Sequence, residues 1–248
     1  PDPAVRARSH RTIALVAIRQ HRYDDAIVAL QRALAVDLDD TGAVELAHTL
    51  LGGVYAGVGR LADALEQHQI AAAMADASGD PVRRGRAHGN LANRLRELGR
   101  MAEAERLLVE SADLSVGADD AFGVMLRHGN LGLLYEDLQR DDEAVAHLSE
   151  AIRLGDLAGT KMMAPRANIM IGRIRGRQGE IAEARRLIEF GLEQARGIHG
   201  DAEIAEGEAQ LGRLALRQGD AEAARTHFEA ALAIALEGND RLAHIDAL

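Results

Sequence analysis

The sequence predicts an all-α solenoid, and three observations carry that prediction. The segment Arg86–Ala104 returns forty residues later as Leu126–Ala144, and both copies contain His-Gly-Asn-Leu. A fixed period of this length indicates stacked units that each contain a pair of secondary-structure elements. Only four prolines occur in 248 residues, so long stretches are free of helix breakers. Aromatic residues make up 2% of the chain, so alanine, the best helix former, and the aliphatic residues must fill the core.

One alanine sets the period, and we call it the ruler alanine. It occurs at Ala26, Ala64, Ala104, Ala144, Ala184 and Ala224, with spacings of 38, 40, 40, 40 and 40 residues. Four of the six turns before it contain glycine, which adopts the left-handed backbone that often ends a helix. Acidic residues follow the turn, where the dipole of the next helix favours them. The pattern therefore predicts six helical hairpins.

The expected helices follow from these turns in chain order. We expect them at 3–20 and 23–37, 42–57 and 61–77, 81–98 and 101–115, 119–138 and 141–157, 161–178 and 181–196, and 201–218 and 221–237. The repeats then span 3–37, 42–77, 81–115, 119–157, 161–196 and 201–237. A partial helix over 240–248 would complete one solenoid domain, 1–248. Asp80 before Pro81 is a typical helix start, and Asp119, Thr160, Asp201 and Asp240 are expected to cap other helices.

Small residues recur at fixed distances from the ruler alanine. Twelve residues before it the chain has Ala14, Gly52, Ala92, Gly132, Gly172 and Gly212, each directly after a large aliphatic residue. Seven residues after it stand Ala33, Ala71, Ser111, Ala151, Gly191 and Ala231. Small side chains let two helices approach closely, and the aliphatic residues fill the space between hairpins.

Composition excludes several classes of function. The net charge of −10 repels phosphates, so we expect no direct binding of nucleic acid. The absence of cysteine excludes disulfides and thiolate metal sites. No apolar run approaches the ~20 residues that span a bilayer, so we expect no membrane partner and a cytoplasmic location. Because there is no initiator Met, we expect the chain to be a piece of a longer protein.

The offsets around the ruler alanine resemble the tetratricopeptide repeat over nearly the entire chain. They comprise the aliphatic–small pair, Tyr55 and Tyr135 three residues after the small residue, and the alanines that follow. The period of this chain is longer than the usual tetratricopeptide period of about 34 residues. The forty-residue period and the doubled His-Gly-Asn-Leu are similar to LGN/Pins-type adaptors and to bacterial sensor domains. The resemblance implies a right-handed superhelix whose first helices line a concave groove for a peptide.

Polar side chains on the first helices are the candidate binding residues. Asparagine can pair with both the N–H and the C=O of an extended peptide, and arginine can hold a carboxylate through two hydrogen bonds. The alternative is that these side chains only solvate an exposed helix face. The predicted groove residues are Arg86, Asn90, Asn93, Asn130, Arg166, Arg173, Arg177, Arg213 and Arg217.

Four histidines, His10, His48, His88 and His128, share one register in the first four repeats. Packed helices lie ~8–10 Å apart, whereas the ligands of one zinc ion lie ~2 Å from the metal. We therefore expect partly buried structural histidines and no metal site. No phosphate-binding loop, nucleophile elbow or zinc-protease motif occurs, so we expect neither a cofactor nor enzymatic activity.

The sequence thus favours a peptide-binding module that forms the sensor or adaptor part of a larger bacterial regulator. Its partner would be an extended, acidic protein segment. The alternative is a structural role, in which the solenoid assembles with itself as a homo-oligomer or docks a fused domain and binds no separate ligand. The sequence does not identify the ligand, the flanking domains or the oligomeric state.

Overall fold

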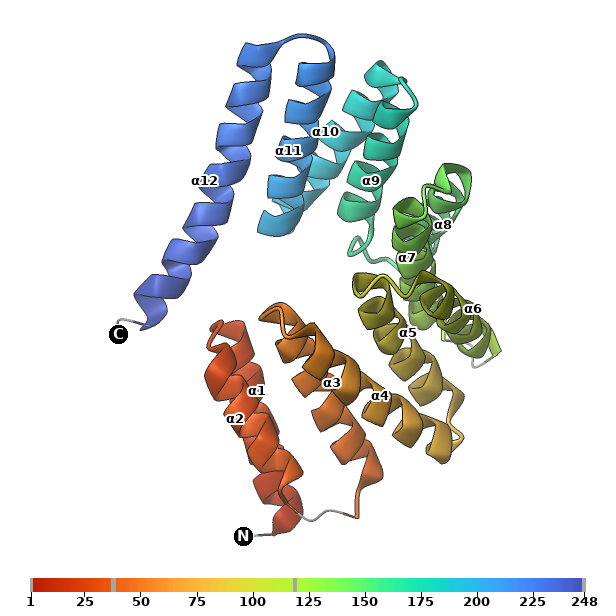
Figure 1. The fold of residues 1–248 in the computed structure, drawn as a ribbon, viewed down its shortest axis with the longest axis vertical. Coiled ribbons are helices and arrows are strands. Elements are labelled where there is room, and N and C mark those ends of the chain that lie inside the picture. Colours follow the sequence, from red (N-terminus) through yellow and green to blue (C-terminus); the bar gives the residue numbers. More distant parts are fainter. Residues whose placement is uncertain (1, 37–38, 118–119, 247–248) are drawn as a thin grey trace. The chain divides into compact units, whose positions relative to one another are not determined.

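Twelve α-helices make up the part of the chain that the computed structural model describes (Figure 1). The structure describes the backbone of residues 2–36, 39–117 and 120–246, and the side chains up to residue 236. No strand occurs in these ranges, so the all-α prediction is confirmed. The helices are α1 (Pro3–Arg19), α2 (Tyr23–Leu34), α3 (Thr41–Gly57), α4 (Leu61–Ser78), α5 (Pro81–Glu97), α6 (Met101–Gly117), α7 (Ala121–Asp137), α8 (Asp141–Leu157), α9 (Ala164–Arg177), α10 (Ile181–Gly197), α11 (Asp201–Arg217) and α12 (Ala221–Asp246).

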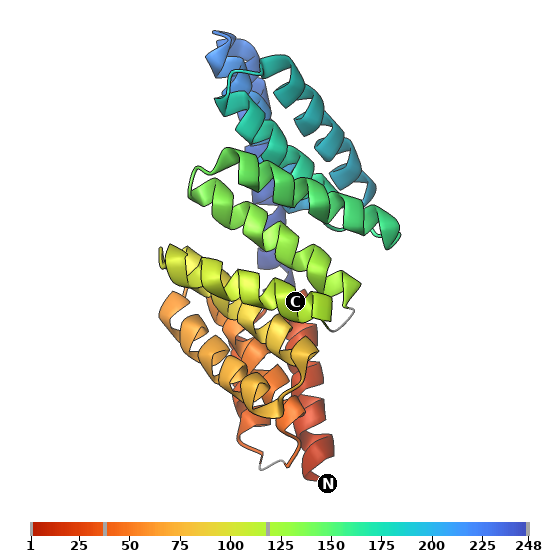
Figure 2. The ribbon, with the colours of Figure 1, turned by 90° about the vertical axis from the view of Figure 1, so that its right-hand side faces the viewer.

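The helices belong to two compact units, Pro1–Gly123 and Val124–Leu248. In the first unit α1 packs on α2, α3 on α4 and α5 on α6, and neighbouring hairpins meet through α2–α3 and α4–α5. Figure 2 shows these hairpins of the first unit from red to yellow. In the second unit α9 packs on α10 and α11 on α12, with α10–α11 joining the two pairs. Stacked hairpins confirm the α-solenoid, while the single domain and the right-handed superhelix stay predictions.

Each hairpin is held by a small residue on its first helix that faces a large side chain on its second. A Cβ placed on Gly132 would lie 2.6 Å from Cγ of Leu148, and one on Gly172 would lie 2.6 Å from Cγ1 of Ile188. Gly212 has the same relation to the ring of Phe228, at 2.9 Å. The small residues twelve before the ruler alanine therefore act as predicted.

The turns within the hairpins need a left-handed residue, and glycine supplies it in four repeats. Gly59, Gly99, Gly179 and Gly219 have φ between 76° and 88°. His21 and Gln139 adopt the same conformation, with φ of 58° and 57°, although a side chain makes it less favourable. The turn geometry is therefore set by the hairpin rather than by glycine alone.

Several expected helix ends are wrong by a few residues. Helix α2 ends at Leu34 instead of 37, and α9 begins at Ala164 instead of 161 because Pro165 suits only a first turn. Gly200, not Asp201, precedes α11, and Thr160 Oγ1 accepts a bond from Met162 N–H before α9 begins. Asp80 caps α5 as predicted by accepting from two backbone N–H groups. Asp119 lies outside the described residues.

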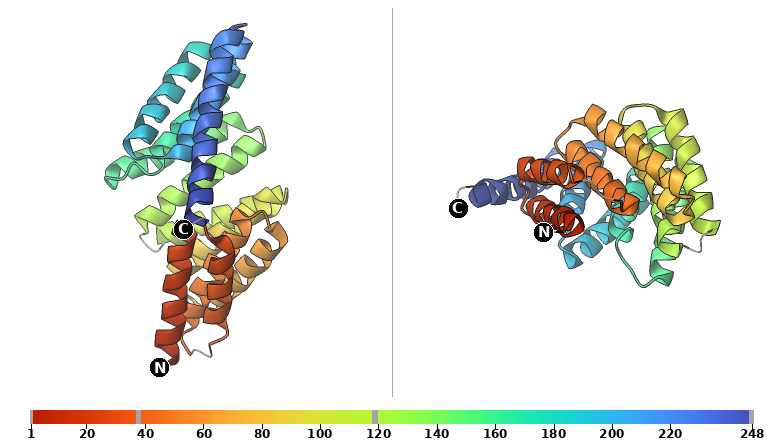
Figure 3. Two further views of the ribbon diagram at one scale, coloured as in Figure 1. Left: turned by 90° about the vertical axis from the view of Figure 1, so that its left-hand side faces the viewer. Right: turned by 90° about the horizontal axis from the view of Figure 1, so that it is seen from below.

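The C-terminal helix differs most from expectation. Helix α12 continues without a break through Asp246, so the separate partial helix over 240–248 and the cap at Asp240 are wrong (Figure 3, left). The separate helix was expected because Asp240 is a typical N-cap residue, but Asp240 lies inside α12, and Gly238 before it costs a helix only about 1 kcal/mol relative to alanine. No helix in the described part of the chain has the length and apolar character that a bilayer crossing requires.

We predict that Gly172→Ala destabilises the protein by about 1–3 kcal/mol. The new Cβ would lie 2.6 Å from Cγ1 of Ile188 and 2.9 Å from the backbone oxygen of Ala184, so α10 would have to move. The matched control is Gly53→Ala, since a Cβ at Gly53 meets nothing within 4 Å. That control should stabilise by about 0.5–1 kcal/mol through helix propensity alone. Urea unfolding measures both, and equal effects would contradict the packing argument.

Candidate functional site

A polar cavity of about 510 Å³ opens between α3, α4 and α5 in the first unit. We call it the α3–α5 cavity. Two of the four α3 residues in its lining are glycines, and a Cβ on Gly53 or Gly57 would meet nothing within 4 Å, so the space beside this part of α3 is open. The cavity is lined by Thr49, Gly53, Ala56, Gly57, His68, Asn90, Asn93, Arg94 and Glu97.

His68 brings a polar ring into a position that is apolar in every other repeat. Four residues after the ruler alanine the other repeats carry Leu30, Leu108, Leu148, Ile188 and Phe228. His68 is only 4% exposed, and its ring packs on Gly52, where a Cβ would lie 2.8 Å from Nε2. The hairpin therefore keeps its close fit but gains a buried nitrogen.

Arg94 is a second polar exception, on the neighbouring helix. Two residues after Ala92, the small residue of its repeat, it stands where the other repeats carry Val16, Val54, Leu134, Ile174 and Leu214. Its Nη1 lies 2.8 Å from Oε2 of Glu97. Burial lowers the pKa of Arg94, and the charge of Glu97 opposes that effect. At the α3–α5 cavity, two polar residues, His68 and Arg94, thus stand at positions where the other repeats have apolar residues.

Three residues that line the cavity have buried polar atoms without a hydrogen-bond partner within the described protein. These atoms are Nδ1 of His68, Oδ1 of Asn93 and Nε of Arg94, and all three are buried. Burial, and secondarily the charge of Arg94, lowers the pKa of His68 to about 4, so the ring is neutral at neutral pH. A buried polar group without a partner costs roughly 1–3 kcal/mol. A ligand that pairs with these atoms would recover that energy.

Asn90 and Asn93 come from one face of α5 and both line the α3–α5 cavity. Asn90 is half-buried and makes no hydrogen bond to any described residue. An amide offers both a donor and an acceptor, which matches a peptide group. The structure thus brings together two of the predicted groove residues.

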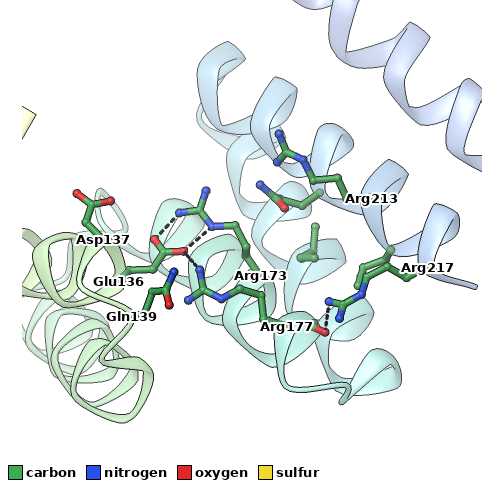
Figure 4. A pocket seen from close by; sticks show the side chains of 11 residues that line it. Glu136, Asp137, Gln139, Arg173, Arg177, Arg213 and Arg217 are labelled. Atoms are coloured by element: carbon green, nitrogen blue, oxygen red, sulfur yellow. Dashed lines mark hydrogen bonds and ion pairs between the residues drawn. The ribbon is translucent and has the colours of Figure 1, made fainter.

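Four predicted arginines meet in a second cavity of about 570 Å³, in the second unit. We call it the α9–α11 cavity (Figure 4). Arg173 and Arg177 extend from α9, and Arg213 and Arg217 from α11. The other lining residues are Glu136, Asp137, Gln139, Gly176, Ile188, Gln210 and Leu214.

Glu136 is the internal partner of the two α9 arginines. It is buried on α7, and its Oε1 accepts from Nε of Arg173 at 2.6 Å, while Nη1 of Arg177 lies 3.5 Å from the same oxygen. Nη2 of Arg173 binds the other carboxylate oxygen, so the pair is bidentate. Burial alone would lower the pKa of Arg173, but the hydrogen bond and charge of Glu136 outweigh it and raise that pKa. Arg177 also donates through Nη2 to Oδ1 of Asp141 at 2.5 Å, so each of the two arginines has a carboxylate partner within the chain.

The two α11 arginines differ from those on α9. Nη1 of Arg217 donates to the backbone oxygen of Gly176. Arg213 is exposed and has neither a hydrogen bond nor an ion pair among the described residues. Of the four, Arg213 therefore carries the positive charge that is most available to a ligand.

The other three predicted groove residues line neither the α3–α5 cavity nor the α9–α11 cavity. Arg86 forms an ion pair with Glu45, a fully buried carboxylate of α3 that Arg83 also binds, at 3.0 Å and 2.6 Å. Arg166 is exposed and lines a third cavity, of about 310 Å³, together with Arg173. Asn130 is half-buried on α7.

Three of the four histidines in the common register contact the other helix of their own hairpin. Nδ1 of His48 lies 2.8 Å from Oε1 of Gln67, and Nδ1 of His128 lies 3.0 Å from Nδ1 of His147. His88 is buried between Asp76 of the preceding hairpin and Glu110 of α6, whose Oε1 lies 3.6 Å from Nδ1 of His88. The partial burial expected of these histidines is confirmed, and their structural role stays a prediction.

Sequence reasoning missed His68, Arg94 and Glu45. The signal for the first two was present, since each is the only polar residue at its register across six repeats. Glu45 gave no comparable signal, because its partners Arg83 and Arg86 lie about forty residues away on the next repeat.

Family comparison places repeats along most of the chain. Four family models, each described as "Tetratricopeptide repeat", match residues 11–81, 89–116, 128–154 and 165–237. A comparison with curated proteins finds no match.

Solved structures with the same fold include three proteins of low identity. The apo form of RapI is 13% identical with a TM-score of 0.81, covering 97% of this chain and 86% of that chain. Aspartyl phosphate phosphatase F from Bacillus subtilis is 14% identical with a TM-score of 0.72, covering 99% and 71%. The Rap conjugation gene regulator of plasmid pLS20, solved with the Phr* peptide, is 14% identical with a TM-score of 0.71, covering 95% and 74%. At these identities the likeness shows the fold alone.

We predict that His68 makes the stability of the protein depend on pH. Because folding lowers its pKa from 6.5 to about 4, the unfolded chain binds more protons between these values. The free energy of unfolding therefore contains a part, due to His68, that is fully present above pH 6.5 and is lost as the pH falls through about 4. This part amounts to about 3 kcal/mol.

This effect is measured by urea unfolding of the wild type and of two variants at position 68, at several pH values between 7 and 4. His68→Leu, which restores the residue of neighbouring repeats, should be more stable and should lose most of the pH dependence. The drop that remains belongs to groups such as His128 and His147, whose pKa values burial also lowers. His68→Gln should flatten the curve without the gain in stability. A His68→Leu curve parallel to that of the wild type would refute the assignment.

Proposed function

The chain belongs to the tetratricopeptide repeat family, and from that premise we propose that it binds an extended peptide segment of a partner protein in the α3–α5 cavity. The observation that carries the proposal is the pair of polar substitutions, His68 and Arg94, at core positions that are apolar in the other repeats. Replacing two aliphatic residues in a packed core costs stability. A binding role accounts for that cost. The pLS20 Rap regulator, which shares the fold and was solved with a peptide, supports this proposal.

Asn90 and Asn93 bind the backbone of the segment. They project from one helix into the cavity, and Oδ1 of Asn93 is a buried acceptor without a partner. Opposite them, the bare backbone at Gly53 and Gly57 leaves room for a main chain to approach α3. Pairing through backbone groups makes this contact independent of the peptide's side chains. Asn130 has the corresponding position one repeat later and plays the same part.

Arginines of the second unit would set the charge preference of a segment that binds to that unit. Arg213 and Arg166 are exposed and have no described ion pair, so each can hold a carboxylate. Arg173, Arg177 and Arg86 already bind Glu136 or Glu45, and they contribute less. Arg217 is tied to the backbone of Gly176 and positions α11 on α9. The preferred segment is therefore acidic despite the net negative charge of the chain.

This function is that of a cytoplasmic sensor or adaptor within a larger bacterial regulator, without catalysis of its own. A fold used as an interaction scaffold, and the absence of a catalytic motif in the sequence, support the non-enzymatic role. The alternative, a purely structural solenoid without a ligand, leaves the polar α3–α5 cavity without a purpose.

We predict that Asn90→Ala/Asn93→Ala weakens peptide binding by about tenfold or more, since each lost backbone pair is worth about 1 kcal/mol. Ligands are first selected from a peptide array and then titrated by fluorescence anisotropy. The loss should be similar for peptides of different sequence, because the amides read the backbone. Lys161→Ala, on an exposed residue outside both cavities, serves as the control. Unchanged affinity in the double variant would remove the α3–α5 cavity from the proposal.

Arg213→Glu tests the charge preference separately. It should weaken the binding of acidic peptides and leave neutral peptides of matched length almost unaffected, with the difference shrinking at high salt. Asn130→Ala, combined with Asn90→Ala, shows whether the second asparagine acts with the first. Equal loss for acidic and neutral peptides would mean that Arg213 has a structural role only.

A further inference from the structure

The α3–α5 cavity and the α9–α11 cavity occupy equivalent positions in the repeat. Eight of the nine residues that line the first have a counterpart three forty-residue periods later that lines the second. In chain order, Gly53, Ala56, Gly57, His68, Asn90, Asn93, Arg94 and Glu97 correspond to Arg173, Gly176, Arg177, Ile188, Gln210, Arg213, Leu214 and Arg217. Each cavity lies within one of the two compact units, so each can bind a ligand by itself.

The two equivalent cavities differ in charge. The α3–α5 cavity is lined by one arginine and one glutamate, Arg94 and Glu97, which pair with each other. The α9–α11 cavity is lined by four arginines and two acidic residues, so positive charge is in excess. Charge complementarity therefore directs an anionic group to the α9–α11 cavity, whereas the lining of the α3–α5 cavity selects for no charge.

A third cavity, of about 310 Å³, adjoins the α9–α11 cavity at Arg173, which lines both. Its apolar lining consists of Leu133, Ile169, Met170 and Ala202. Residues that line the two cavities follow one another three or four apart and hence lie on one face of each helix, at 166, 169, 173 and 177 on α9 and at 202, 206, 210, 213 and 217 on α11. Together the two cavities form one groove, apolar near the starts of these helices and basic near their ends. We call it the second-unit groove.

Two side chains at the basic end of the second-unit groove are available to a ligand. Arg213 is exposed and has no described partner, and in Figure 4 its guanidinium lies apart from Glu136. It can hold a carboxylate through two hydrogen bonds without displacing an internal partner. Gln210 has the register of Asn90 and is only 3% exposed. Its Nε2 donates to Glu206, and no described residue donates to its Oε1, which can accept from a peptide N–H.

We propose that the second-unit groove is a second binding site of this chain, for a segment that carries both an apolar side chain and a carboxylate. The apolar side chain fills the end lined by Leu133, Ile169 and Met170, and the carboxylate binds Arg213. Both cavities of the groove have volumes typical of ligand sites, ~300–1,000 Å³. The inference rests on the proposed function in taking the ligand to be a peptide, and it adds a site with its own preference.

Fluorescence anisotropy with a set of labelled peptides tests the proposal. The peptides consist of serine and alanine and carry one phenylalanine and one aspartate at increasing separation. Peptides whose separation matches the groove should bind the wild-type chain. Replacing the aspartate with asparagine, or the phenylalanine with serine, should weaken binding by about tenfold or more. Added salt should weaken the aspartate peptide more than its asparagine counterpart.

Two variants test the two ends of the groove. Ala202→Phe fills the apolar end from an exposed position, and Arg213→Gln removes the charge but keeps a polar side chain. Each should weaken binding of the matching peptide by about tenfold, and Arg213→Gln should also remove the preference for aspartate over asparagine. Ala182→Phe is the matched control, on an exposed residue of α10 outside all three cavities, and it should bind like the wild type. Circular dichroism verifies that each variant is folded.

The variant Asn90→Ala/Asn93→Ala shows which site the same peptides occupy. Loss of binding in this variant alone would assign the peptides to the α3–α5 cavity, which overturns the second site and leaves the proposed function intact. Loss in Ala202→Phe and Arg213→Gln alone supports the second site, even if the α3–α5 cavity binds nothing. Equal loss in all three variants would mean one site instead of two. That result, binding of no peptide in the set, or equal affinity for aspartate and asparagine peptides would overturn the proposal.

Discussion

The close contact between the two helices of each hairpin is the constraint on which the rest of the structure depends. A glycine or alanine on the first helix lets a large side chain of the second lie directly on its backbone, as Leu148 does on Gly132 and Ile188 on Gly172. This fit fixes the spacing of the pair, and the aliphatic residues around it then face the next hairpin. Because the same fit recurs every forty residues, each hairpin offers its successor an equivalent surface.

At His68, one repeat keeps the close contact between its two helices although the large side chain is polar. The imidazole has the bulk to fill the space above Gly52, so the hairpin keeps its geometry. It replaces apolar contact with a buried nitrogen, however, and Arg94 does the same on the adjoining helix. The proposed binding site thereby occupies positions that pack the core in other repeats, and the exception is visible only by comparison with those repeats.

The period, the hairpins and most helix ends could be predicted from sequence because they depend on local signals, such as the turn glycines and the cap at Asp80. The sequence indicated the groove residues but not the acidic residues that bind some of them. Arg86 and Arg173 were chosen for their charge, but Glu45 and Glu136 bind that charge from other repeats. Such pairing depends on which rotamers meet across packed helices, and a single sequence does not encode that directly. The continuation of α12 was missed because Asp240, which was expected to cap a new helix, lies inside this one.

The carboxylate of Glu136 has a consequence for any anion that enters the α9–α11 cavity. Arg173 and Arg177 converge on it from α9, so an anion that approaches these two arginines meets cations that already have carboxylate partners. The free energy that the anion gains is only the difference between its own contact and the contact with Glu136 that it displaces. The displaced Glu136 side chain must then be solvated by water or paired with another cation. An anion that binds this arginine pair would therefore exchange with the resident carboxylate, whereas Arg213, which has no described ion pair, offers a contact that displaces no internal partner.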